Sequence, residues 1–292
     1  MNPAHAASPS RLPAEPGAPA APSALRRVIA TVLLATVALY ALLLAALWFG
    51  QERLLFHPVP LDPALPLAAP AGQPDVHERW VDVPGARLSV LELRLPNPKG
   101  VVFFLHGNAG NLESWFVNPA LYRQANFDLV MLDYRGFGKS SGRIESEAQL
   151  KSDVQAVWDD VAPRYAGRRV VFFGRSLGSG LAAALAAQVQ PDLTMLVSPY
   201  RSMVAVAGQH YPWVPAALLR YPLRTDALLG RIRTPVVLIH GERDALIPVS
   251  HSQALQAIAP KARLVVLPGA AHGDLQEFES YLQAVSAQLQ AL

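Results

Sequence analysis

The chain has 292 residues, of which 51% are apolar, so it is long enough for one large domain with appendages and can bury a substantial core. It contains no cysteine, which excludes disulfides, thiolate metal sites and a cysteine nucleophile. The formal net charge is only +3 and basic residues never run beyond a pair, so we expect no nucleic-acid partner.

The N-terminal part of the chain predicts a disordered tail followed by a membrane helix. Residues 1–26 hold six prolines among alanines and serines and lack apolar periodicity, so they should be disordered. Residues 27–49 carry no charge after Arg27, and at about 1.5 Å per residue such a helix reaches roughly 33 Å, enough to span a bilayer. We expect an uncleaved signal anchor. A buried core helix fits less well, because the segment is apolar on every face, and a cleaved signal peptide would have a shorter apolar core of about 7 to 15 residues.

The charges beside this span predict its orientation. Arg11, Arg26 and Arg27 precede the span, whereas Arg53 follows it. Since positive charge favours the cytoplasmic side, we expect the N-terminus in the cytoplasm and the rest of the chain in the periplasm or outside a bacterial cell. Residues 50–76 hold six prolines and predict an extended tether, which leaves residues 77–292 as the folded domain.

Strand and helix patterns alternate along this domain. Apolar runs predict strands at 79–83, 87–95, 101–105, 129–133, 170–173, 193–197, 235–239 and 263–266. Helical patterns occur at 112–124, 146–165, 177–190, 250–259 and 275–289. Two early strands followed by strand-helix alternation predict an α/β fold with a largely parallel sheet and helices on both faces. In such sheets the chemistry lies beyond the carboxyl ends of the strands.

One strand-to-helix junction carries a reactive group. Gly174-Arg175-Ser176-Leu177-Gly178 fits G-x-S-x-G, in which small residues on either side of the serine allow a sharp, strained turn. Such a turn lifts the Ser176 hydroxyl above the sheet. The bland alternative is a glycine-rich turn with a solvated serine.

An acid and a histidine follow later strands, in the order that acyl transfer with a serine nucleophile requires. Asp244 lies a few residues after 235–239, and His272 lies after the last strand. A serine hydroxyl needs a neutral imidazole to accept its proton, and the imidazole needs a carboxylate to fix its tautomer. The N–H groups of Leu177 and Asn108 are placed to bind an oxyanion.

Six segments together resemble a known family. HGNAGN, DYRGFGKSSG, GRSLGSG, SPYRSM, HGERDALIP and AHGD, spread over residues 51–292, resemble the α/β-hydrolase fold, in particular its single-span membrane-anchored serine hydrolases. The resemblance implies an eight-stranded, mostly parallel sheet with a short cap insert. It also implies that Ser176 is the nucleophile, Asp244 the acid and His272 the base. The base loop departs from that branch, reading Ala-His-Gly where Gly-His-Asn is frequent.

Other histidines compete for the role of base. His251, in the helix after Asp244, is the second candidate. His106 and His240 each follow a strand as His-Gly and are expected to be structural. His272 is preferred because only it occupies the loop after the last strand.

Other charged residues near strand ends have structural interpretations. Asp133 belongs to a segment in which aspartate and arginine are expected to pair locally. Asp274, two residues from His272, could brace that loop, but it is too close in sequence to reach the correct imidazole nitrogen. Arg175 is expected to be solvated or salt-bridged and has no catalytic role.

Residues 202–233 form an insert too short for a large lid. Its apolar stretches contain Met203, Tyr211 and Trp213. They either cover the sheet as an ordinary buried helix or line an acyl pocket over Ser176, and the sequence supports both interpretations equally.

The function predicted from these residues is hydrolysis of a carboxyl ester or thioester through an acyl-enzyme. The substrate would be a small or lipid-like acyl compound, and the membrane would be contacted through the N-terminal helix. A peptidase or amidase with the same three residues is an alternative, as is a non-catalytic binding module of the same fold. No cofactor or metal is implied, and the sequence does not determine the oligomeric state.

Overall fold

The computed structural model describes residues 24–68 and 71–292, which divide into a unit ending at Ala45 and a unit of Ala46–Leu292. The predicted disordered tail, residues 1–26, lies outside the described residues except for its last three, which begin helix α1. This helix spans Ala24–Leu55 and is long and apolar enough to cross a membrane. It continues past the predicted end at Phe49 because its last turns are held by side-chain contacts within the second unit: Gln51 Oε1 accepts a hydrogen bond from Arg220 N over 2.6 Å.

The segment after the helix does not stand away from the domain as the extended, semi-rigid tether expected for residues 50–76 would. In the part we call the docked segment, residues 51–61, the N–H of His57 donates to Asn108 O over 2.7 Å and the N–H of Leu61 donates to Gly138 O over 2.8 Å. Phe56 is buried against the ring of Tyr221, with centroids 5.2 Å apart. The prolines therefore shape a segment that packs onto the domain, and the compact unit begins at Ala46 rather than near His77.

All eight predicted strands are present, with ends that differ by a few residues. The strands are β1 (His57–Pro58), β2 (Val76–Val83), β3 (Ala86–Leu93), β4 (Gly100–Leu105), β5 (Ala109–Gly110), β6 (Phe127–Leu132), β7 (Arg169–Arg175), β8 (Leu193–Val197), β9 (Val236–Gly241) and β10 (Arg263–Leu267). The two short strands β1 and β5 were not predicted; they pair with each other in parallel.

The five helices predicted after the membrane segment are present, with interruptions, and two short helices in the insert of residues 202–233 were not among them. The helices after α1 are α2 (Leu112–Trp115), α3 (Pro119–Ala125), α4 (Glu147–Val161), α5 (Leu177–Val189), α6 (Met203–His210), α7 (Thr225–Leu229), α8 (Ser250–Ile258) and α9 (Glu279–Gln290), with 3₁₀ turns at Ala162–Tyr165, Ala216–Leu218 and Leu275–Glu277. The helix expected at 112–124 is broken because Asn118, at φ 55°, precedes Pro119, which disfavours helical backbone in the residue before it.

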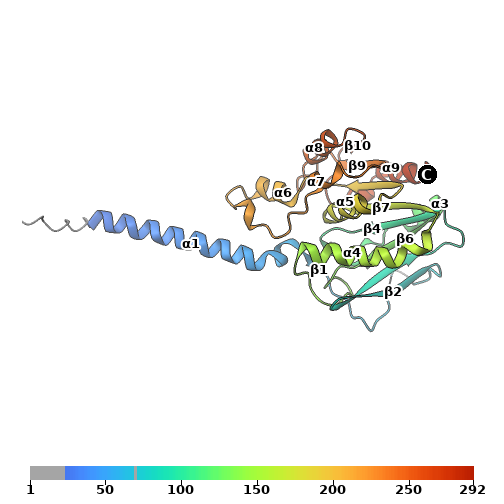
Figure 1. Ribbon diagram of the computed structural model, residues 1–292, viewed down its shortest axis with the longest axis horizontal. Coiled ribbons are helices and arrows are strands. Elements are labelled where there is room, and N and C mark those ends of the chain that lie inside the picture. The colour runs from blue at the N-terminus through green and yellow to red at the C-terminus, as the bar shows by residue number, and fades with distance from the viewer. Residues whose placement is uncertain (1–23, 69–70) are drawn as a thin grey trace, which may run out of the picture. The chain divides into compact units, whose positions relative to one another are not determined.

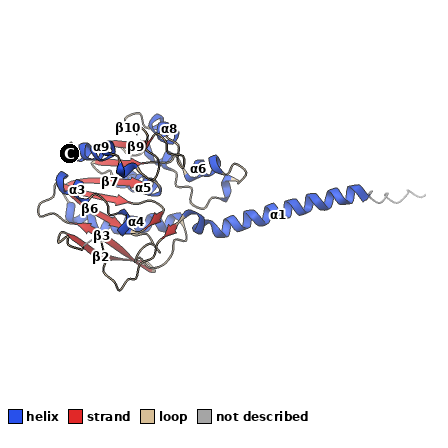
Figure 2. Cartoon of the chain, turned by 180° about the vertical axis from the view of Figure 1, so that it is seen from behind, coloured by secondary structure: helices blue, strands red, loops and turns tan. Residues whose placement is uncertain are grey.

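The eight longer strands form one sheet in the order β10-β9-β8-β7-β4-β6-β3-β2 (Figure 1). The strand β3 is antiparallel to both neighbours, and the run from β6 to β10 is parallel. Helices cover both faces of the sheet (Figure 2). The mostly parallel α/β fold is thus confirmed, and the carboxyl ends of β7, β9 and β10 meet at one edge.

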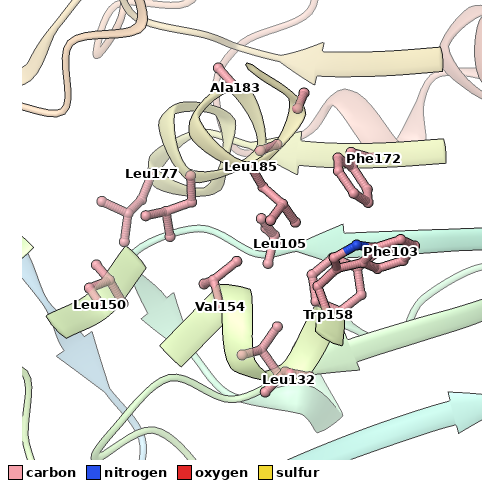
Figure 3. Close-up of a cluster of buried hydrophobic side chains, with 14 of the residues drawn as sticks. Phe103, Leu105, Leu132, Leu150, Val154, Trp158, Phe172, Leu177, Ala183 and Leu185 are labelled. Atoms are coloured by element: carbon pink, nitrogen blue, oxygen red, sulfur yellow. The ribbon is translucent and has the colours of Figure 1, made fainter. Parts of the chain in front are cut away.

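Alternate side chains of each strand enter two cores, as the pleat of a strand requires. From β4, Phe103 and Leu105 face the layer formed by α4 and α5, while Phe104 faces α3 and α9. Figure 3 shows the first layer, where Trp158 packs edge-on against Phe103 and Phe172 with centroids 5.5 and 4.7 Å away. A sheet packed on both faces holds its strand ends, and so the loops that follow them, in fixed positions.

Candidate active site

The turn between β7 and α5 has the strained geometry that its glycine spacing predicts. Ser176 adopts φ 51° and ψ −119°, a backbone region that residues with a side chain rarely occupy. A Cβ on Gly174 would lie 2.3 Å from Gly178 O, and one on Gly178 would lie 2.0 Å from Leu105 O. Only glycines allow the strand and helix to approach this closely, which places Ser176 at the rim of the sheet.

The loops after β9 and β10 bring Asp244 and His272 to this serine. His272 Nε2 lies 3.0 Å from Ser176 Oγ, and His272 Nδ1 lies 2.7 Å from Asp244 Oδ2. In this arrangement Nδ1–H donates to the carboxylate, so Nε2 is free to accept the proton of the hydroxyl. Three residues far apart in the sequence thus form one hydrogen-bonded line.

The carboxylate at the end of the line is held in its charged form. Burial alone raises the pKa of Asp244, but hydrogen bonds from His240 and His272 and from the N–H of Ile247 outweigh burial and lower the pKa well below its usual range. The N–H groups of Leu246 and Ile247 donate to Oδ1 over 3.1 and 2.8 Å. Asp244 therefore stays a fixed anion beside the imidazole.

The loop of residues 107–111 after β4 forms another wall of the site. Its residue Asn108 lines the hollow beside Ser176. Its side-chain Nδ2 donates to Leu55 O over 2.9 Å, and its carbonyl accepts from His57. Leu177 is the first residue of α5, so its N–H has no acceptor within the helix. The oxyanion role of the Asn108 and Leu177 N–H groups stays a prediction.

The hollow beside the serine has a volume of about 370 Å³. It is lined by Gly107, Asn108, Ala109, Gly110, Ser114, Trp115, Val117, Arg175, Ser176, His272, Gly273 and Gln276. Trp115 and Val117 are its large apolar side chains. The sequence did not indicate either residue as part of the site, although both directly follow the glycine-rich loop that supplies the rim of the hollow.

The three cap residues predicted to bind substrate do not line this hollow. Met203 packs at the edge of the core, and the side chains of Tyr211 and Trp213 are 56% and 48% exposed. The insert also differs from a buried helix, because none of the residues of α6 is buried. Its helix is held at the surface instead, with Gln209 bonded to His251 and His210 bonded to Leu246 O.

The competing histidines lie elsewhere. Both ring nitrogens of His251 are occupied, Nδ1 by the N–H of Arg201 and Nε2 by Gln209 Oε1, so it has no contact with Ser176. His240 bonds Ser252 and Ile247 O and supports Asp244 from behind, with Nε2 3.4 Å from its Oδ2.

One of the competing charged residues, Asp133, has a different partner from the one expected. Asp133 does not pair with the arginine of its own segment, because Arg135 forms an ion pair with Asp153 at 2.6 Å. Asp133 Oδ1 instead lies 3.5 Å from Nε2 of the buried His106. Asp274 braces the base loop as expected, since its Oδ1 accepts the N–H of Ala271 over 2.7 Å.

Comparison with known families gives one match, to the family described as "Serine aminopeptidase, S33", over residues 96–225. This range contains Ser176 but ends before Asp244 and His272.

Two relatives match more of the chain. An uncharacterized protein of Mycobacterium tuberculosis is 33% identical over 268 residues, covering 86% of this chain and 90% of the relative. The alpha/beta hydrolase domain-containing protein 17B of Xenopus tropicalis is 31% identical over 206 residues, covering 68% of this chain and 69% of the relative. Among solved structures, an esterase of Pyrococcus furiosus superimposes with a TM-score of 0.63 at 19% identity, covering 80% of this chain and 99% of the esterase.

Proposed function

Because the chain belongs to the α/β-hydrolase superfamily, we propose that it is a membrane-anchored serine hydrolase that cleaves a carboxyl ester or thioester. Ser176 Oγ attacks the acyl carbon while its proton passes to His272 Nε2, and the carbonyl oxygen becomes an oxyanion. His272 then gives this proton to the departing alcohol or thiol. Water, deprotonated by the same nitrogen, then attacks the acyl carbon, the bond to Ser176 Oγ breaks, and His272 returns the proton to Oγ as the acid leaves.

The observation that carries this proposal is the line of contacts at 3.0 Å and 2.7 Å from Ser176 through His272 to Asp244. The ionised Asp244 stabilises the imidazolium that forms during the attack. The N–H groups of Leu177 and Asn108 would stabilise the oxyanion, each by an amount that commonly exceeds a hundredfold in rate. A binding module has no need of all these elements at a strained serine.

The lining of the hollow favours an ester or thioester over the aminopeptidase chemistry named in the family description. An aminopeptidase must bind the free α-ammonium of its substrate, which requires a carboxylate at the site. The residues that line the hollow include Arg175 but neither aspartate nor glutamate. A cationic substrate end would therefore meet a like charge.

The test is labelling by a fluorophosphonate probe, which reacts with an activated serine. Since these groups act as one unit, we expect no labelling of Ser176→Ala, almost no labelling of His272→Ala, and weak residual labelling of Asp244→Asn. The matched control is His251→Ala, which removes a histidine that does not reach Ser176. Full labelling of Ser176→Ala, or normal turnover by His272→Ala beside an inactive His251→Ala, would contradict the assignment.

The acyl chain is proposed to lie against Trp115 and Val117, the large apolar side chains of the hollow. Each buried methylene contributes about 0.8 kcal/mol, so four more methylenes raise kcat/KM by up to about two orders of magnitude. We expect kcat/KM on p-nitrophenyl esters to rise from acetate to hexanoate and Trp115→Ala to flatten the rise. Trp213→Ala is the control, because Trp213 does not line the hollow. A series that peaks at acetate in the unaltered protein would refute an apolar acyl site.

Helix α1 is proposed to be the anchor, with the N-terminus in the cytoplasm and the catalytic unit on the other side of the membrane. The long apolar helix and the excess of arginine before it support this orientation. Carbonate extraction should leave the protein in the membrane pellet, and a phosphatase reporter fused after Leu292 should be active. An inactive phosphatase together with an active cytoplasmic reporter at the same position would reverse the orientation.

A further inference from the structure

Arg175, directly before the serine, is a buried cation without a carboxylate partner. Arg175 is only 6% exposed, and no carboxylate oxygen of the described residues lies within 4.0 Å of its guanidinium. Among the described residues its guanidinium makes one hydrogen bond, from Nη2 to His272 O over 3.2 Å, and it lies 5.2 Å from the centroid of the Trp115 ring. This differs from the salt-bridged or solvated side chain that the sequence suggested.

The other buried arginine of the described residues has a carboxylate partner. Arg135 forms a bidentate pair with Asp153. Even the more exposed Arg164 forms such a pair, with the buried Glu92. An uncompensated buried charge is costly, because the protein does not replace the water that solvated it. Burial accordingly lowers the pKa of Arg175 from its usual value. This effect outweighs the electrostatic effects of Tyr281, Asp244 and Asp274, which raise the pKa.

The position of Arg175 shows where this charge acts. Arg175 lines the hollow on which Ser176 and His272 open, and it also lines the neighbouring cavity beside Trp115 and Tyr281. The lining of the hollow contains the cation of Arg175 and no acidic residue, and the nearest anion, Asp244, is bonded to His272 behind the lining. Gln276 and Ser114, which also line the hollow, add neutral hydrogen-bonding groups.

We propose that Arg175 is a specificity-determining residue that binds an anionic group of the substrate, a carboxylate or a phosphate, held beside the scissile carbonyl. This rests on the proposed hydrolase function and narrows its substrates to anionic esters. The guanidinium donates charge-assisted hydrogen bonds to the anion, and the substrate supplies the counter-charge that the protein lacks. A neutral ester of the same size leaves Arg175 uncompensated.

The test uses two pairs of esters, with the full chain in detergent. For an anion on the acyl side, mono-p-nitrophenyl glutarate is compared with p-nitrophenyl pentanoate, which has a methyl where the glutarate has its carboxylate. For an anion on the alcohol side, 1-butyrylglycerol 3-phosphate is compared with 1-butyrylglycerol. We expect kcat/KM to favour the anionic member of at least one pair by about ten- to a hundredfold, mainly through KM.

The variants separate anion binding from support of the base loop. Arg175→Gln should lower kcat/KM for the anionic ester about ten- to a hundredfold more than for its neutral match, so that the preference is lost, and Arg175→Lys should restore part of the preference. Arg233→Gln, which removes the same charge from an exposed position, should change kcat/KM for neither ester. If the unaltered protein shows no preference in either pair, or if Arg175→Gln lowers both members equally, Arg175 serves only to hold His272 and the proposal is wrong.

A binding measurement distinguishes this failure from failure of the hydrolase proposal. In the Ser176→Ala chain, which cannot form an acyl-enzyme, calorimetry should show tighter binding of the favoured anionic ester than of its neutral match. Adding Arg175→Gln should remove the difference. Binding with this preference but without turnover in the unaltered protein would support the anion site and refute hydrolysis, whereas equal binding of both members would refute the anion site.

Discussion

The elbow around Ser176 and the docked segment 51–61 both shape the site, but they are held in place differently. The elbow is fixed by its immediate neighbours, through the contacts that Gly174 and Gly178 permit between β7, β4 and α5. The docked segment is fixed by main-chain hydrogen bonds to residues more than fifty positions later, such as Asn108. The nucleophile is therefore positioned by local sequence, whereas the loop that faces it depends on the end of α1.

This difference predicts different consequences of damage. A change in the elbow should prevent the chain from folding around Ser176 at all. A change in the docked segment should leave the elbow intact and displace the loop of residues 107–111, so that stability or turnover falls by a limited amount.

The largest effect is expected at Gly178. In Gly178→Ala the new Cβ would lie 2.0 Å from Leu105 O, which is backbone and cannot move aside. We expect a loss of more than about 4 kcal/mol of stability, or no folded protein. The measurement is thermal unfolding, with Gly208→Ala as control, because Gly208 lies in α6 with nothing within 4 Å of a Cβ. The control should gain up to about 1 kcal/mol, and a Gly178→Ala chain as stable as the control would show that the elbow is not locally constrained.

A smaller effect is expected at Phe56 of the docked segment. Phe56→Ala removes the buried ring that contacts Tyr221, and this should lower the free energy of unfolding by about 3 kcal/mol. Leu54→Ala, two residues earlier and 59% exposed, should change stability by less than about 0.5 kcal/mol. Unfolding of the two variants, followed by circular dichroism in the same detergent, compares them directly. Equally small losses of unfolding free energy in the two variants would mean that the docked segment does not pack onto the domain.

The smallest effect is expected at Asn108, where the two regions meet. Asn108→Ala removes the hydrogen bond from Nδ2 to Leu55 O but keeps the backbone N–H that is predicted to bind the oxyanion. We expect kcat to fall about tenfold with KM nearly unchanged, because a displaced loop would hold its N–H less well against the oxyanion of the transition state. The free energy of unfolding should fall by about 1 kcal/mol. Steady-state kinetics beside Asn97→Ala, an exposed asparagine, checks this. If Asn108→Ala lost this stability but kept its kcat, the contact with the docked segment would have no part in catalysis.

The sequence was sufficient wherever a local pattern reflects a local constraint. Glycine spacing predicted the strained turn at Ser176, and the position after a strand selected His272 over His251. Apolar runs predicted all eight strands of the main sheet, and they are clearest in its parallel part, because buried parallel strands are near-continuous apolar runs.

Long-range contacts account for what the sequence did not predict. The docked segment is held largely by main-chain groups, which every residue possesses, so its prolines indicated only an extended chain. Trp115 and Val117 are ordinary apolar residues until the loop before them is placed beside Ser176. Arg175 gives no sign in the sequence that its charge lacks a partner, because a missing carboxylate is visible only once the whole fold is assembled.

The docked segment also affects the order in which the chain can fold during synthesis. Gln51 bonds Arg220, and the two residues are 169 positions apart. At about 5 to 20 residues per second, roughly 10 to 30 s pass between their synthesis. Throughout that time Phe56 has been made but Tyr221, against which it packs, has not. The segment that leaves the ribosome directly after the apolar helix is therefore among the last to reach its final place, and any delay in translation before Arg220 prolongs the exposure of its aromatic side chain.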